Sequence, residues 1–188
     1  MCMTAKPIEI IAYDPEWPGQ FELLRRFFES ELGELVQEIY HVGSTAVAGL
    51  SAKPVIDLDI VLKDLSLLDH AIAQLGVLGY TYRGEMGISG RHAFSSDVSA
   101  IAFAHHLYVC DPQSDAFKNH ISLRDFLRSN PEARDEYAAL KRQLAESNAY
   151  DMDAYVQGKT AFITRILAAA GFERSALDLI QKENTFDR

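Results

Sequence analysis

The stretch HVGSTAVAGLSAKPVIDLDIVL, residues 41–62, decides the fold that this sequence predicts. It opens on a turn at residues 43–45 and continues into Pro54–Leu62, a β-branched and mostly apolar segment that predicts a buried strand. Two acidic residues, Asp57 and Asp59, interrupt that segment. Because side chains alternate along a strand, both carboxylates point to one face, and their Cα atoms lie about 6.5–7 Å apart. The apolar residues that alternate with them occupy the opposite face.

Two carboxylates at this spacing suit a hard divalent cation, and the sequence predicts Mg²⁺ or Mn²⁺ held by Asp57 and Asp59 as metal ligands and catalytic groups. Unpaired acids on so apolar a strand are costly, so a metal, a basic partner or water has to compensate them. The turn adds Gly43, Ser44 and Thr45, whose backbone N–H groups and hydroxyls suit the phosphates of a small nucleotide. The alternative is an ordinary turn followed by a strand whose acids face solvent.

The rest of the chain predicts an α+β domain, with a mixed β-sheet flanked by helices and a helical C-terminal third. The expected helices cover residues 14–33, 66–79, 115–128, 151–171 and 176–181, and one more begins at Asn130-Pro131-Glu132. The expected strands cover residues 36–42, 54–62, 80–85, 91–95, 100–104 and 106–110. Ser66, Asn130 and Asp151 are predicted helix caps. No linker or repeat divides the sequence, so residues 1–188 are expected to form one domain.

The composition excludes several classes of protein. The chain has 188 residues, 18 basic against 27 acidic, and its net charge of −9 argues against long nucleic acid as a partner. Its cysteines, Cys2 and Cys110, predict neither a disulfide framework nor a zinc site. No uncharged apolar run approaches the ~18–20 residues of a membrane span, and the first residues do not predict a signal peptide. We expect a cytoplasmic protein with a small nucleotide as ligand and no membrane partner; a protein partner stays open.

Several blocks of this sequence resemble the GrpB family. Residues 41–62 are close to the family's usual HIGSTSVPGLAAKPIIDIDIVV, and the similarity continues through GEMGISGRHAF, HHLYVC, LRDFLRSNPEARDEYAALKRQLA and YVQGKTAFITRIL. The family is related to the nucleotidyltransferase (polymerase-β-like) superfamily, whose mark is a Gly-Ser turn followed by an acid-x-acid strand. Gly43 and Ser44, with Asp57 and Asp59, match that mark. The resemblance implies the nucleotidyltransferase fold, but a fold does not by itself specify an activity.

The sequence departs from the superfamily pattern at the position of a third acid. Active nucleotidyltransferases usually carry this carboxylate on a later strand, which aligns here with HHLYVC. His106 stands where the acid is expected, as a candidate catalytic residue, and Tyr108 replaces a histidine of the GrpB pattern. An imidazole can bind a metal but brings no negative charge, so a mechanism with two Mg²⁺ ions stays open. We expect His106 and Tyr108 to share the face of Asp57 and Asp59, and His105 to point away from it.

Other candidate site residues each have two interpretations. Lys53 and Arg91 are candidate phosphate ligands, although Lys53 can also neutralise an aspartate and Arg91 can form a surface ion pair. His41 is either a ligand or proton carrier beside the acids, or a structural histidine. Lysines and arginines on helices are usually solvated, and this is the expectation for Lys141. The remaining candidates are Glu85 beside a glycine-rich loop, and Arg124 and Lys159 in blocks of the family resemblance.

Three functions fit these residues. The first is a metal-dependent nucleotidyltransferase-like enzyme that acts on a small nucleotide and a small-molecule or protein acceptor. The second is a non-catalytic nucleotide-binding or protein-interaction module that retains the fold. The third is a metal-dependent hydrolase whose ligands are His41, His106, Asp57 and Asp59. The surroundings of Asp57 separate them: a histidine or acid within ligand distance of both aspartates favours catalysis, and a buried lysine or arginine in that space favours the module.

Overall fold

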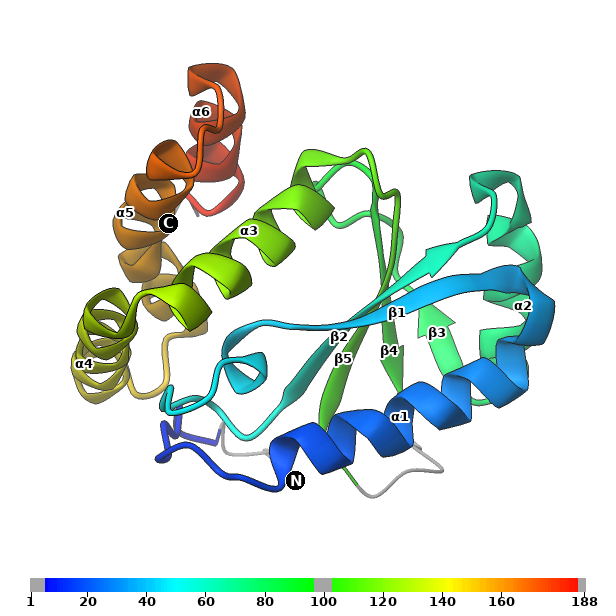
Figure 1. Cartoon of the computed structure of the whole chain (residues 1–188), viewed down its shortest axis with the longest axis horizontal. Coiled ribbons are helices and arrows are strands. Elements are labelled where there is room, and N and C mark those ends of the chain that lie inside the picture. Colours follow the sequence, from blue (N-terminus) through cyan, green and yellow to red (C-terminus); the bar gives the residue numbers. More distant parts are fainter. Residues whose placement is uncertain (1–5, 97–102, 186–188) are drawn as a thin grey trace.

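The computed structural model describes residues 6–96 and 103–185, which form a mixed five-stranded sheet with helices on both faces (Figure 1). The strand order is β1-β2-β5-β4-β3, and β2 and β5 are the parallel pair. The strands are β1 (Val36–Val42), β2 (Ile56–Leu62), β3 (Tyr80–Tyr82), β4 (Arg91–Ser96) and β5 (His105–Cys110). The helices are α1 (Trp17–Leu32), α2 (Leu68–Val77), α3 (Asp115–Ser129), α4 (Pro131–Ser147), α5 (Met152–Ala169) and α6 (Arg174–Glu183). These elements confirm the predicted fold class.

Two of the predicted strands differ from the structure. The strand expected at residues 80–85 is shorter, because β3 ends at Tyr82 and a glycine-rich loop follows it. Of the strand expected at residues 100–104, residues 100–102 lie outside the described part of the chain, and residues 103 and 104 are not in a strand. β5 therefore follows β4 as its antiparallel neighbour and pairs on its other side with β2.

One face of the sheet is apolar, and α1 and α2 cover it (Figure 1). Leu24 and Phe28 of α1 are fully buried against strand residues that include Leu58. Burying a side chain of this size stabilises the fold by about 1.5–3 kcal/mol, so this layer supplies much of the stability. The prediction that the apolar residues of β2 share one face is confirmed by the membership of this core: Ile56, Leu58, Ile60 and Leu62.

The opposite face of the sheet is covered by α3, and α4, α5 and α6 extend this helical layer beyond the sheet (Figure 1). Tyr40 of β1 packs edge-on against Phe117 of α3, with ring centroids 5.1 Å apart. A second apolar core joins the helices to one another, and in it the rings of Tyr137 and Phe162 stack. In the described part of the chain, no helix is both long enough and apolar enough to span a membrane.

Side-chain caps decide where several helices begin. Asp151 accepts a hydrogen bond from the backbone N–H of Ala154, as predicted, and caps α5. The predicted cap Ser66 is wrong, because its own backbone N–H donates to Asp64 at the start of the short 3₁₀ turn that precedes α2. The Asn130 side chain does not cap α4. It donates instead to the carbonyl of Phe126 and closes the preceding helix α3.

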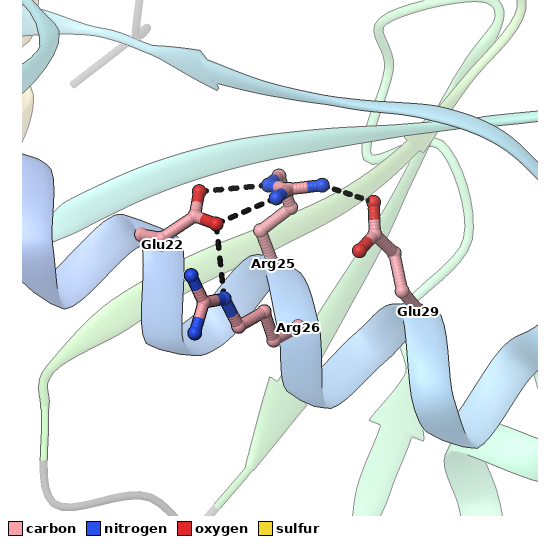
Figure 2. A network of polar contacts seen from close by, with 4 residues as sticks. All are labelled: Glu22, Arg25, Arg26 and Glu29. Atoms are coloured by element: carbon pink, nitrogen blue, oxygen red, sulfur yellow. Dashed lines mark hydrogen bonds and ion pairs between the residues drawn. The ribbon is translucent and has the colours of Figure 1, made fainter.

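The solvent face of α1 carries a network of ion pairs (Figure 2). Arg25 donates to Glu22 and to Glu29, one turn away on either side, and Arg26 also donates to Glu22. The hydrogen bond from Arg25 lowers the pKa of the Glu22 carboxyl to about 2. Exposed pairs of this kind contribute little to stability, so they mark the outer surface of α1 and take no part in the site.

Candidate functional site

The predicted turn and the predicted acids meet directly. Gly43 ends β1 with a φ of +67°, and a Cβ at this position would overlap the carboxylate of Asp57. Glycine is therefore required here for two reasons, the left-handed backbone and the close approach of a side chain. The next residue, Ser44, begins a short 3₁₀ turn (Ser44–Ala46), and both it and Asp57 line the same cavity.

The acids share one face of β2, as predicted, and this face lies toward the helical layer, where each acid is hydrogen-bonded to a histidine. Asp57 pairs in register with His106 of the parallel strand β5, and His106 Nδ1 lies 2.7 Å from Asp57 Oδ1. Tyr108 pairs in the same way with Asp59, so both predicted residues of β5 share the face of the acids. His105 points to the apolar face, where its Nε2 lies 2.6 Å from the Tyr80 hydroxyl. The predicted orientation of β5 is confirmed.

The histidine beside Asp59 is His120 of α3, a residue that the sequence did not single out. Its Nδ1 lies 2.7 Å from Asp59 Oδ2, and the Asp59 side chain is fully buried. Burial alone would lower the pKa of His120, but the carboxylate of Asp59 outweighs it and raises the pKa. The other oxygen, Asp59 Oδ1, is buried without a hydrogen-bond partner. A buried carboxylate oxygen left unpaired is costly and indicates a place for a ligand.

His41 does not reach the acids. It pairs in register with Leu58 and therefore lies on the apolar face, where its ring stacks on Phe21 with centroids 4.6 Å apart. Its Nε2 lies 3.0 Å from the hydroxyl of Thr45, which is itself buried, and burial lowers the pKa of His41 to about 4. The structural interpretation of His41 thus matches its position, and the four ligands of the hydrolase hypothesis are not brought together.

Basic side chains from the helical layer hold the loop that follows β1. Arg124 donates to the carbonyl of His41, and Arg128 donates two hydrogen bonds to the carbonyl of Ala46. Further along the loop, Arg142 donates to the hydroxyl of Ser51. Arg124, a candidate site residue, therefore positions the end of β1 that leads into the turn. These contacts hold a loop that has little regular secondary structure of its own.

The expectation that Lys141 is solvated is wrong, because its side chain is buried. Its side chain is only 2 % exposed, and its ammonium donates to the Ser44 hydroxyl at 2.9 Å and to the Ser51 carbonyl at 2.5 Å. It also lies 4.7 Å from the ring centroid of Tyr137, a cation–π contact. Burial lowers the pKa of Lys141 to about 7. Among the described residues, no carboxylate forms an ion pair with it.

Lys159 of α5 makes the same kind of cation–π contact as Lys141. Its ammonium lies 4.5 Å from the ring centroid of Tyr155, and burial lowers its pKa to about 8. Both pairs have the spacing Tyr-x-x-x-Lys, which places the two side chains on one face of a helix. Two cations without carboxylate partners therefore face the turn and Asp57, and an anion is the ligand that would compensate them.

The turn and the two lysines line a common cavity of about 660 Å³, here called the turn cavity. Its walls include Ser44, Asp57, Lys141 and Lys159 together with five further candidates of the sequence: Thr45, Lys53, Arg91, His106 and Tyr108. The guanidinium of Arg91 lies 4.7 Å from the ring centroid of Tyr108, and burial, with the nearby Asp57 carboxylate, raises the pKa of Tyr108 to about 12. This volume lies in the range of small-molecule sites, roughly 300–1,000 Å³.

Glu85 has a structural position outside the turn cavity. Its carboxylate accepts a hydrogen bond from the backbone N–H of Gly90 and so closes the glycine-rich loop between β3 and β4. In the same loop, Met86 is exposed with a φ of +50° and reaches the wall of the turn cavity. Glu85 therefore stabilises the glycine-rich loop that brings Met86 to the turn cavity.

The donor set at the acids fits a hard divalent cation completed by phosphate oxygens. Asp59 Oδ1 is buried without a hydrogen-bond partner, and Asp57, which lines the turn cavity, stands two residues away on the same face. Within residues 6–96 and 103–185, no group of three or more His, Cys, Asp or Glu side chains is arranged to hold a metal. A cation at this site would therefore rely on two carboxylates and on its substrate, which is how Mg²⁺ is commonly bound.

Comparisons with known proteins identify the family and the fold of the chain. The family model described as GrpB protein matches residues 7–169. The UPF0157 protein YqkA of Bacillus subtilis is 32% identical over 158 residues, which are 84% of this chain and 46% of YqkA, so the chain spans about half of that relative's length. The crystal structure of conserved protein GrpB from Enterococcus faecalis superposes with a TM-score of 0.75 at 32% identity, over 90% of this chain and 98% of that one.

A more distant likeness concerns the fold alone. Terminal uridylyl transferase 4 from Trypanosoma brucei, solved with bound CTP, superposes with a TM-score of 0.50 at 16% identity. The superposition covers 87% of this chain and 54% of the transferase. The chain thus has the fold that nucleotidyltransferases use.

Proposed function

The chain belongs to the GrpB family, and from this premise we propose that it binds a small nucleotide together with a divalent cation and transfers the nucleotidyl group to a small-molecule or protein acceptor. The observation that carries the proposal is the buried and unpartnered Asp59 Oδ1, which lies two residues along β2 from Asp57, the acid that approaches Gly43 of the turn. The fold of the chain, which terminal uridylyl transferase 4 shares, supports the same conclusion.

Asp57 and Asp59 are the residues that would hold Mg²⁺ or Mn²⁺. When bound, the cation would neutralise charge on the phosphates of the nucleotide. The backbone N–H groups of Gly43 and Ser44, with the Ser44 hydroxyl, would bind the same phosphates, and Ser44 lines the turn cavity. Lys141 reaches this hydroxyl directly, and Lys159 lines the same cavity.

The transfer reaction makes one bond and breaks one. An acceptor hydroxyl oxygen bonds to the α-phosphorus, the bond from this phosphorus to the bridging oxygen breaks, and pyrophosphate leaves with the charge. The hydroxyl proton passes to solvent. Arg91 and Lys53 line the cavity as cations that would balance charge on the leaving group.

A binding module without catalysis is the second candidate, and a specific observation favours it. His106 and Tyr108 occupy the strand positions that face the two acids, so no third carboxylate stands there. His106 reaches Asp57 alone, because the histidine beside Asp59 is His120. A buried lysine, Lys141, also lies close to the turn. A binding module of this kind would bind the nucleotide but would form no pyrophosphate.

The test is calorimetric titration of the full chain with Mg²⁺ complexes of ATP, GTP, CTP and UTP. Asp57→Asn and Asp59→Asn should each weaken the best complex at least about tenfold, because a charged ligand contact is lost. Asp69→Asn, on the exposed face of α2, is the matched control and should bind like the parent chain. Melting temperatures confirm that each variant is folded. Undiminished affinity in both acid variants would overturn the assignment.

Pyrophosphate release separates the enzyme from the module. The chain is incubated with the best nucleotide, Mg²⁺ and a small-metabolite extract, and released pyrophosphate is measured. The enzyme predicts release that depends on the extract and disappears in Asp57→Asn. Nucleotide binding without any release would support the module.

A further inference from the structure

A second cavity lies between α3, α5, α6 and the loop that precedes β4, and we call it the helical cavity. Its volume is about 460 Å³. Its apolar walls come from α5 and α6, where Val156, Ile163, Leu179 and Ile180 line it. Figure 1 shows α5 and α6 side by side at the end of the helical layer, which agrees with their contacts. This cavity is large enough for a small molecule, since such sites hold roughly 300–1,000 Å³.

The helical cavity and the turn cavity share a wall. Arg91 and Lys159 line both of them, and His120, which bonds Asp59, lines the helical cavity. A molecule in the helical cavity would therefore lie against the same side chains that flank the acids. Transfer between two substrates requires two adjoining sites of this kind.

The shared wall is cationic and incompletely satisfied. Arg91 Nε is buried without a hydrogen-bond partner, and together with Asp59 Oδ1 it makes up the buried unpartnered side-chain atoms of the described residues. Within the described residues, neither Arg91 nor Lys159 forms an ion pair with a carboxylate. An anionic group at this wall would compensate both cations, and the apolar walls opposite would cover an apolar body.

The other polar residues of the helical cavity argue against a second polyphosphate. Asp111, Asp115 and Glu183 line it, and their carboxylates would repel a chain of phosphates. The turn cavity has Lys53 and Lys141 in addition to the shared cations, so the phosphates of a nucleotide fit there better. The two cavities thus differ in the charge of the ligand that each can hold.

We propose that the helical cavity is the acceptor site, and that the acceptor is a small molecule with an apolar body and one anionic group at Arg91 and Lys159. The role of acceptor that this inference gives to the ligand rests on the proposed function. The existence of the ligand site rests on the cavity alone. The acceptor's own hydroxyl would point toward the shared wall, where the nucleotide phosphates lie on the other side.

Anilinonaphthalene sulfonate is a suitable probe, because it has an apolar body, one anionic group and fluorescence that rises in apolar surroundings. We would titrate it into the full chain, with and without saturating Mg²⁺·ATP. Leu179→Asp places a negative charge on the apolar wall at a residue that is 43% exposed, so the fold should tolerate it. Val77→Asp adds the same charge on α2 at a residue that is 89% exposed and outside the cavity.

The proposal expects saturable binding of the probe that weakens at least about fivefold in Leu179→Asp and changes less than about twofold in Val77→Asp. It also expects the probe to keep saturable binding at saturating Mg²⁺·ATP, since the two ligands occupy different cavities whose shared cations are Arg91 and Lys159. Equal weakening in both variants, absence of saturable binding, or displacement of the probe by Mg²⁺·ATP would each overturn it. Melting temperatures show that both variants are folded.

The same titrations distinguish this inference from the proposed function. If Mg²⁺·ATP binds and the probe does not, the acceptor site fails while the nucleotide site stands. If the probe responds to Leu179→Asp but no nucleotide binds, the proposed function and the acceptor role both fail, and a ligand site without nucleotidyl transfer remains.

Discussion

The two faces of the central sheet use the same strands for opposite purposes. On the face covered by α1 and α2, residues such as Leu58 and Phe28 are buried among other apolar side chains. On the face covered by α3, the same strands present Asp57, Asp59 and Tyr108. Among the residues that the structure describes, the two buried side-chain atoms without a partner, Asp59 Oδ1 and Arg91 Nε, belong to the second face.

This contrast indicates that one face of the sheet supplies stability, whereas the other face carries the residues that we propose bind a ligand. The apolar face gains free energy from the burial of its side chains. The polar face carries the cost of buried charges, and a ligand would relieve it. Variants on the first face should therefore change the free energy of unfolding, and variants on the second should change ligand affinity or its dependence on pH.

The largest effect is expected for Phe28→Ala on the apolar face. Removing a fully buried ring should lower the free energy of unfolding by about 3–5 kcal/mol, measured by denaturant titration. Leu23→Ala on the same helix is the control, because Leu23 is 55% exposed and should lose less than about 1 kcal/mol. Loss of nucleotide affinity in a folded Phe28→Ala variant would contradict the separation of the two faces.

Gly43→Ala tests the place where the turn approaches the acids. The left-handed backbone and the overlap with Asp57 should together cost about 2–4 kcal/mol of unfolding free energy and weaken Mg²⁺·ATP binding. Gly19→Ala is the matched control. Gly19 lies in α1 with open space around it, so alanine there should be neutral or stabilising. Equal stability of the two variants would show that the approach to Asp57 is not tight.

Ser44→Ala sharpens the comparison by changing the polar face alone. Loss of one hydroxyl hydrogen bond to a charged phosphate should weaken nucleotide binding by about 1.5–3 kcal/mol, measured by calorimetry. Ser66→Ala, an exposed serine outside the site, should leave the affinity unchanged. An unchanged dissociation constant for Ser44→Ala would mean that Ser44 only shapes the turn and accepts from Lys141.

Lys141 predicts how stability depends on pH. Its pKa is about 7 in the folded chain, so between that value and the ordinary 10.5 the unfolded chain binds more protons. Stability should therefore rise with pH across this window, by at most about 1.4 kcal/mol per pH unit from this residue. Lys141→Met should flatten the rise, and Lys63→Met, at an exposed lysine, should not. Denaturant titrations from pH 7 to pH 9.5 measure the slope; equal slopes in parent and Lys141→Met would contradict the buried ammonium.

The smallest effect is expected for His106, whose side chain is half exposed. Its pair with Asp57 should contribute less than about 1 kcal/mol to stability. His106→Ala should weaken Zn²⁺ or Mn²⁺ more than Mg²⁺, because imidazole suits the softer ions, and His106→Asp should shift the preference toward Mg²⁺. Metal titrations of both variants measure this, and unchanged selectivity would leave His106 as a hydrogen-bond partner of Asp57 only.

Local patterns in the sequence were enough to predict the elements and half of the site. The alternation in β2 predicts which face carries Asp57 and Asp59, and the structure confirms it. The glycine at position 43 and the cap at Asp151 follow from backbone chemistry within a few residues. Each of these features depends only on residues that are close together in the sequence, so the sequence alone is enough to predict it.

The remainder depends on how distant elements pack. His120 meets Asp59 across 61 positions, and Lys141 meets Ser44 across 97, so the rotation of α3 and α4 about their axes decides both contacts. His41 is a question of register: it pairs with Leu58, and a shift of one residue would have turned it toward the acids. Period and propensity specify which residues share a face of one element, but only the packed structure determines which two faces meet.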